Sequence, residues 1–203
     1  MRKIAMFLII LGIASLSFYI SYRYINEKKN IESIEEYLEE TKIVDIEYPT
    51  IEEQPVEIEE PKKEEKQVEL DYHAILEIPS INLKRGLVES TIGFKSINYA
   101  ISIDNSSNYP NTSGNFILYA HSGNAYYSYF RNLGYVNIND DIYVYYQGIK
   151  YFYKVYKIYE IDKTGTMDII RPADEKIITL LTCKNGTEKQ IVVLGKQIDS
   201  ERY

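Results

Sequence analysis

Short apolar runs separated by turn signals fill the C-terminal part of the chain, and this pattern limits the possible folds more than any other feature. Asp141–Tyr146 and Lys150–Ile161 alternate apolar and polar residues around Gln147-Gly148, which predicts a β-hairpin. Lys176–Cys183 and Gln190–Gln197 form a second pair of runs around an Asn-Gly dipeptide, which suits turn positions with positive φ. Many short strands with little helix predict a mostly β barrel or sandwich of about 130 residues.

Three further elements are expected in the same region. Ala74–Pro79 is typical of a strand that a proline ends, and Asn115–Ala120 is typical of a strand that follows a turn-rich segment. Asn124–Leu133 is the best candidate for a short α-helix, because Gly134 follows it at a C-cap position. With two strands and one short helix, these elements keep the predicted domain mostly β.

The N-terminus carries a long apolar segment. Ile4–Tyr22 contains no charged residue and, as a helix rising about 1.5 Å per residue, just spans the roughly 30 Å hydrocarbon core of a membrane. Tyr19, Tyr22 and Tyr24 lie where an interfacial aromatic belt would be. A cleaved signal peptide would have a shorter apolar core and a small-x-small cleavage site. An uncleaved anchor is therefore favoured, and residues 1–26 are assigned to one transmembrane helix.

An acidic segment follows the anchor. Glu35-Glu36 and Glu39-Glu40 fit a helix around Ile31–Thr41, and beyond it three prolines among Glu and Lys favour an extended, self-repelling chain. Residues 27–70 are therefore expected to be a solvated spacer that holds the C-terminal domain away from the membrane. The net charge of −7 mainly describes this spacer and argues against a general nucleic-acid binder.

Cys183 is the only cysteine, so its thiol is buried and inert, bridges to another molecule or is reactive. A reactive thiol needs an imidazole that holds its proton and later delivers it to a leaving amine. His73 lies at the junction of spacer and domain, where a surface histidine is the simplest interpretation. His121 directly follows the predicted strand Asn115–Ala120, so both it and Cys183 lie at strand ends, which can meet at one rim of a barrel. These residues alone leave a catalytic pair and inert packing equally open.

Longer motifs point to one family. Thr179–Cys183 reads Thr-Leu-Leu-Thr-Cys and resembles the TLxTC signature of the sortases. Ile75–Leu83 is similar to the opening I-x-I-P-x-I-x-L of that family, and Asn115–His121 is similar to the strand that carries its histidine. The segment from Tyr129 to Asp141 resembles the F-x-x-L…G-D-x-I segment that comes next. The resemblance covers roughly residues 71–198, in the family's order.

This resemblance implies an eight-stranded sortase-type β-barrel at residues 71–203 and a membrane-anchored cysteine transpeptidase. Cys183 would attack the Thr–Gly carbonyl of an LPxTG-like sorting signal, and His121 would protonate the departing glycine amine. An amine of a peptidoglycan precursor or of a pilin lysine would then resolve the thioacyl enzyme. The implied partners are sorting-signal proteins, this amine acceptor and the membrane, with no nucleic acid, no cofactor and no metal.

The chain departs from the family at one expected catalytic position. Sortases carry an arginine on the strand after the cysteine, where it positions the sorting signal and helps to stabilise the oxyanion. Aligning the Val-Val core of that strand places Gln190 there, which can donate a hydrogen bond but brings no charge. Lys189 beside it would point to the other face of the strand, and Arg171 is a second candidate for the missing charge. Leu181, Thr182 and Lys189 are expected to contact the substrate.

Subclass, substrate and orientation stay open. Ala120–Gly123 reads Ala-His-Ser-Gly in place of the commoner Gly-His-Arg or Gly-His-Asn, which leaves a class B- or D-like and a divergent sortase as alternatives. The Cys-His pair also suits a hydrolytic cysteine peptidase, and the missing arginine suits a catalytically impaired envelope-binding module. The expected specificity loops, Asn82–Asn98 and Glu160–Pro172, carry no readable code. Basic residues flank the apolar segment on both sides, so an extracellular domain follows mainly from Arg2-Lys3 and from the functional interpretation.

Overall fold

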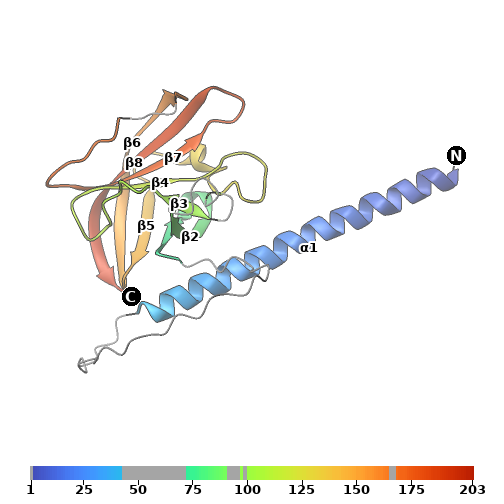
Figure 1. Ribbon diagram of the computed structural model, residues 1–203, viewed down its shortest axis with the longest axis horizontal. Coiled ribbons are helices and arrows are strands. Elements are labelled where there is room, and N and C mark those ends of the chain that lie inside the picture. The colour runs from blue at the N-terminus through green and yellow to red at the C-terminus, as the bar shows by residue number, and fades with distance from the viewer. Residues whose placement is uncertain (1, 43–71, 91–96, 98–99, 165–167) are drawn as a thin grey trace, which may run out of the picture.

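The computed structural model describes residues 2–42, 72–90, 97, 100–164 and 168–203. One long helix, α1 (Arg2–Glu40), precedes strands that close into a barrel in the order β1-β2-β3-β4-β7-β8-β6-β5 (Figure 1). The strands are β1 (Ala74–Ile78), β2 (Leu83–Glu89), β3 (Ile101–Ile103), β4 (Gly114–Tyr119), β5 (Asp141–Tyr146), β6 (Ile149–Asp162), β7 (Lys176–Cys183) and β8 (Lys189–Arg202). The 3-10 helices η1 (Pro79–Ile81) and η3 (Leu133–Tyr135) lie between strands. The predicted eight-stranded β-barrel with an N-terminal apolar helix is confirmed.

The turn residues make the two predicted hairpins. Gln147 (φ 50°) and Gly148 (φ 72°) both adopt left-handed conformations, which suit the two-residue turn that joins β5 to β6. Gly186 (φ 72°) supplies the left-handed residue between β7 and β8. β8 extends past its predicted end at residue 197, because β6 pairs with it as far as Ile149 opposite Arg202.

Strand β7 lies between β4 and β8. It runs parallel to β4, with Tyr119 opposite Leu181, and antiparallel to β8, with Cys183 opposite Gln190. Because β4 and β7 run in the same direction, their C-terminal ends meet at one rim of the barrel.

Alternate residues of these strands fill the barrel interior. Phe116 and Leu118 of β4 belong to the central core together with Ile178 and Leu180 of β7. The residues between them point to the outer face, since successive side chains of a strand project to opposite sides.

The outer face is covered near the start of β4 and β7. There the Thr179 hydroxyl donates to the Asn115 side-chain oxygen (2.9 Å), and the Asn115 amide donates to the carbonyl of Ile170 (2.9 Å). The segment that precedes β7 therefore lies over this part of the sheet. Burial ends toward Leu181 and Cys183, which are both half-buried.

Two local expectations were wrong. Asn124–Leu133 forms turns, not an α-helix, and Gly134 lies inside η3 instead of capping a helix. Isolated helices shorter than about 12–15 residues are marginal, and the buried Phe130 anchors the turns instead. Strand β2 takes up the first half of the segment expected as the loop Asn82–Asn98, because β1 and β3 pair with its two edges.

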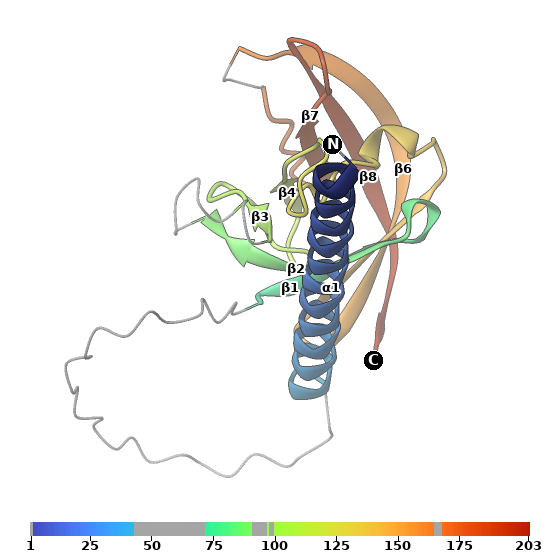
Figure 2. The same ribbon diagram turned by 90° about the vertical axis from the view of Figure 1, so that its right-hand side faces the viewer.

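Helix α1 continues through the predicted boundary between anchor and spacer at residue 26. It is long and apolar enough to cross a membrane by length and composition. Its N-terminal half projects away from the barrel, and its C-terminal half runs alongside it (Figures 1 and 2). The expected helix around Ile31–Thr41 is therefore confirmed as part of α1, whereas the spacer from residue 43 to residue 70 lies outside the described residues.

Polar and apolar contacts hold α1 against the barrel. The Arg85 guanidinium donates to both carboxylate oxygens of Glu27 (2.9 and 2.5 Å), a two-point pairing that fixes orientation as well as distance. Ile34 is buried, and the Tyr37 hydroxyl donates to the carbonyl of His73 (2.8 Å). The last turn of α1 thus meets the chain where the barrel begins.

Candidate active site

Three residues form a row across neighbouring strands at one rim of the barrel. Tyr119, the last residue of β4, lies opposite Leu181 of β7, and His121 and Cys183 each follow two residues later, His121 just past the end of its strand. On the other side of β7, Gln190 pairs directly with Cys183. Since adjacent strands lie about 4.8 Å apart, Cys183 and Gln190 are direct neighbours across β7 and β8, and His121 lies at the end of the strand on the other side of β7, although 62 and 7 residues separate the three in the sequence.

The thiol of Cys183 faces the outside of the barrel. Leu180 is part of the central core and Thr182 is buried, so the alternating residues Leu181 and Cys183 project outward. Gln190 projects to the same face, because directly opposed residues of paired strands share a side. Cys183 and Gln190 are both half-buried, which leaves the row open to a substrate that lies along the outer face.

Hydrogen bonds tie the residues that flank His121 to those that flank Cys183. The Thr182 hydroxyl, 3% exposed, donates to the carbonyl of Ala120 (2.8 Å). The Ser122 hydroxyl donates to the side-chain oxygen of Asn185 (3.0 Å). The two strand ends are therefore held together on both sides of the pair, and the Thr182 hydroxyl serves this link.

The turns after β4 also fix His121. Phe130, which is fully buried, donates its backbone N–H to the His121 carbonyl (3.0 Å). The imidazole packs against Tyr127 with ring centroids 5.5 Å apart and an interplanar angle of 61°. This edge-on geometry is one of the arrangements that aromatic pairs prefer.

Neither charged candidate takes the place of Gln190 in the row. Lys189 is exposed and pairs in register with Asp162 of β6. The guanidinium of Arg171 donates to the carbonyl of Ser106 (2.9 Å), beside the start of β4. The neighbouring residue Ile170 is bonded to Asn115, six residues or about 20 Å along the strand from His121.

An ion pair lies close to the rim. The ammonium group of Lys184, directly after Cys183, hydrogen bonds to the carboxylate of Glu160. This hydrogen bond lowers the pKa of the exposed Glu160 below its usual range. The ammonium group of Lys184 therefore lies beside β6, the strand that carries Glu160.

A family model described as a sortase domain matches residues 76–198. The chain belongs to the sortase family. Sortases are cysteine transpeptidases, and Cys183 is the only cysteine in this sequence.

Solved sortase structures have a similar fold. The sortase D5 transpeptidase of Clostridium perfringens is 22% identical, with a TM-score of 0.57 over 64% of this chain and 80% of its own. A lid mutant of sortase A from Corynebacterium diphtheriae is 24% identical, with a TM-score of 0.60 over 66% of this chain and 73% of its own. Sortase A of Listeria monocytogenes is 22% identical, with a TM-score of 0.58 over 65% and 90%. No curated protein matches this sequence.

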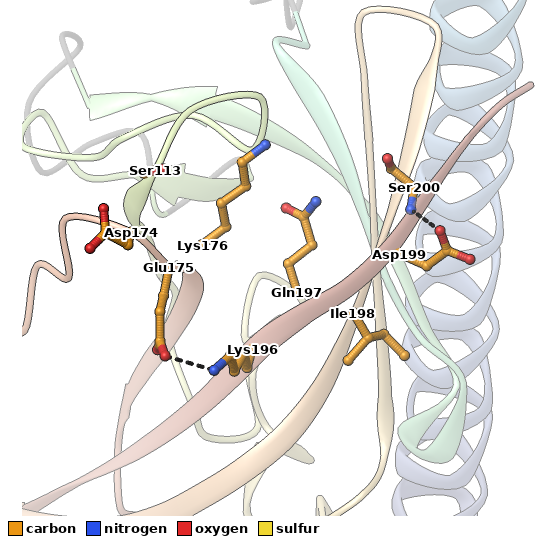
Figure 3. Close-up of a pocket in the computed structure, with 9 residues that line it drawn as sticks. All are labelled: Ser113, Asp174, Glu175, Lys176, Lys196, Gln197, Ile198, Asp199 and Ser200. Atoms are coloured by element: carbon orange, nitrogen blue, oxygen red, sulfur yellow. Dashed lines mark hydrogen bonds and ion pairs between the residues drawn. The ribbon is translucent and has the colours of Figure 1, made fainter.

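A shallow polar pocket of this sortase lies far from Cys183. Lys176 at the start of β7 contributes to it, whereas Cys183 ends the same strand about 23 Å further on. An ion pair between Glu175 and Lys196 (2.7 Å) lies within it (Figure 3). The pocket is lined by Ser113, Asp174, Glu175, Lys176, Lys196, Gln197, Ile198, Asp199 and Ser200. It contains neither a thiol nor an imidazole, so the row at the other rim remains the candidate active site.

The sequence missed the residues that support the row. Tyr127 and Ser122 lie in turns that no periodicity reveals, and their contacts depend on how β4 and β7 pair. The one signal for this segment in the sequence is the cluster of aromatic residues after His121.

Proposed function

We propose that this sortase is a transpeptidase that cleaves an LPxTG-like sorting signal, with Cys183 as the nucleophile and His121 as the general acid. The observation that supports it is the row of His121, Cys183 and Gln190 across β4, β7 and β8, open on the outer face. A thiol beside an imidazole is the arrangement that nucleophilic catalysis by cysteine requires.

The reaction runs in two steps. The Cys183 thiolate attacks the Thr–Gly carbonyl, a thioacyl bond forms, the C–N bond breaks, and His121 donates a proton to the departing glycine amine. An acceptor amine then attacks the thioacyl carbonyl, gives its proton to His121 and releases the Cys183 thiolate. The acceptor is an amine of a peptidoglycan precursor or of a pilin lysine, and neither step needs a cofactor.

The anchor and the substrate contacts belong to the same proposal. The charge-free part of α1 crosses the membrane once, and the barrel lies on the extracellular side, where sorting signals and their acceptors meet. Leu181, which is half-buried on the outer face beside Cys183, contacts the sorting signal, and Lys189 contacts it at the rim.

The test uses the full-length protein in detergent micelles and a peptide that contains Leu-Pro-x-Thr-Gly. Mass spectrometry should find a thioacyl adduct on Cys183, and an added amine such as oligoglycine should remove it with formation of a transpeptidation product. A product that does not increase with the amine would indicate a hydrolytic peptidase. A folded protein that forms no adduct with any sorting-type peptide would favour an envelope-binding module.

Gln190 is expected to stabilise the oxyanion through its side-chain amide. Gln190→Ala should lower kcat/KM by about 10²-fold, since loss of one such donor typically costs 10²–10³ in rate. Gln190→Arg should keep or exceed the original rate, because a guanidinium donates from the same position and adds charge. Steady-state cleavage of a quenched fluorescent peptide measures both variants.

The matched control is Gln197→Ala, which removes the same side chain from β8 at the far pocket. Gln197 is half-buried like Gln190 but lies far from Cys183, so its replacement should leave kcat/KM within about twofold. Equal losses in Gln190→Ala and Gln197→Ala would contradict a catalytic role for Gln190.

A further inference from the structure

Helix α1 touches the segment that carries His121. The ring of Tyr22 meets the ring of Tyr126 edge to face, with centroids 5.7 Å apart and an interplanar angle of 89°. Tyr22 is the last residue of the charge-free part of α1, and Tyr126 lies in the turns after β4. The anchor helix thus contacts the barrel at the end of its apolar segment.

The contact continues ring by ring to the imidazole. Tyr126 packs against Tyr127 with centroids 5.1 Å apart at 81°, and Tyr127 packs against His121 at 5.5 Å and 61°. Three consecutive ring contacts therefore connect Tyr22 of α1 to His121. All three have the tilted or edge-on geometry that aromatic pairs favour.

A second contact holds the same turns. Arg85 of β2, which pairs with Glu27 of α1, also lies over the ring of Tyr129 at 5.8 Å from its centroid. A guanidinium over an aromatic face is attracted by the ring quadrupole. The helix thus reaches the turns after β4 directly through Tyr126 and indirectly through Arg85.

The series of ring contacts ends on the imidazole itself. β4 ends at Tyr119, so no strand pairing fixes the side chain of His121. The Phe130 N–H holds only the His121 backbone, whereas Tyr127 packs against the ring itself. Tyr126 is 45% exposed and packs against both Tyr22 of α1 and Tyr127, so it links the helix to the ring that contacts the imidazole.

We propose that Tyr22, Tyr126 and Tyr127 are positioning residues through which the docked anchor helix orients His121 toward the leaving amine. This inference deepens the proposed function and rests on it for the proton transfer. A displaced imidazole would protonate the amine poorly while Cys183 stays in place. Full activity on amide substrates therefore requires α1 docked on the barrel.

The first test compares two substrates of the full-length protein in nanodiscs. One is the sorting-signal peptide, and the other is its ester analogue, in which oxygen replaces the scissile glycine nitrogen. The ester releases an alcohol, which needs less help from a proton donor than the amine that the peptide releases. Misplacement of His121 should therefore slow cleavage of the amide more than cleavage of the ester. Tyr126→Ala and Tyr22→Ala should lower kcat for the amide by about tenfold and kcat for the ester by about twofold or less.

The controls separate positioning from loss of fold. Tyr22→Phe and Tyr126→Phe keep the rings and should retain both rates. Tyr24→Ala removes the same side chain from a position on α1 that is 69% exposed and should also retain both rates. Equal losses for amide and ester in Tyr126→Ala would overturn the inference, because a merely less stable protein loses both activities alike.

The second test does not depend on activity. The chain has two histidines, so isotope labelling of histidine in the full-length protein gives two sets of imidazole NMR signals, which His73→Gln assigns. Tyr22→Ala and Tyr126→Ala should shift and broaden the His121 signals, whereas Tyr24→Ala should not. Unchanged His121 signals in Tyr22→Ala would overturn the inference. If the unaltered protein cleaves neither substrate, the proposed function fails, and these signals alone decide whether α1 orients His121.

Discussion

Cys183→Ala is expected to abolish the thioacyl adduct and to lower peptide cleavage by at least about 10⁴-fold, because it removes the proposed nucleophile. The barrel should remain intact, since Cys183 is the half-buried last residue of β7 and alanine keeps its Cβ. Intact-protein mass spectrometry measures the adduct, and chromatography of the peptide measures cleavage.

Ser200→Ala serves as the matched control for this loss. Ser200 is exposed on β8 at the far pocket, so its replacement should leave both adduct and cleavage unchanged. Circular dichroism should give the same melting temperature within a few degrees for both variants. An adduct that persists in Cys183→Ala would assign the nucleophile to another residue and contradict the proposed mechanism.

His121→Ala is expected to lower amide cleavage by about 10²–10⁴-fold, the range that one general acid–base residue usually contributes. The loss should be smaller with the ester analogue, whose leaving group needs less protonation. The loss of amide cleavage in His121→Ala sets the upper limit for the losses in Tyr22→Ala and Tyr126→Ala, since these variants act only through His121.

His73→Gln is the matched control among the histidines. The His73 side chain is 37% exposed and lies 3.7 Å from Glu89, and its carbonyl, which accepts from Tyr37, stays in the variant. Cleavage should remain within about twofold, as is usual for surface substitutions away from a site. A loss in His73→Gln as large as that in His121→Ala would mean that the row at the rim does not hold the only essential imidazole.

The parts of the fold that follow local patterns could be predicted from the sequence. β7 has the predicted bounds, because apolar residues and β-branched threonines continue to Cys183 and a turn follows. The β5–β6 hairpin also follows from alternation and a turn that accepts positive φ. β2 and β3 could not be predicted in this way. β3 has only three residues, too few to show a period, and β2 forms because both of its edges are paired, one with the preceding β1 and the other with β3.

The same distinction between local patterns and long-range pairing applies to the candidate site. Cys183 and His121 stand at strand ends that the sequence reveals, but their pairing depends on a parallel register between β4 and β7. No local spacing encodes this register, which the bond from Thr182 to Ala120 helps to fix. The ring contacts from Tyr22 to His121 were unpredictable for the same reason, since they join α1 to turns about a hundred residues later in the chain.

The bond between Tyr37 and His73 joins the two ends of an intervening stretch of chain. As long as α1 is docked, this bond and the pairing of Arg85 with Glu27 set the distance between barrel and helix, whatever the length of chain between them. If α1 is the proposed membrane anchor, the docked barrel is therefore confined to the bilayer surface and meets its substrates by diffusion in two dimensions.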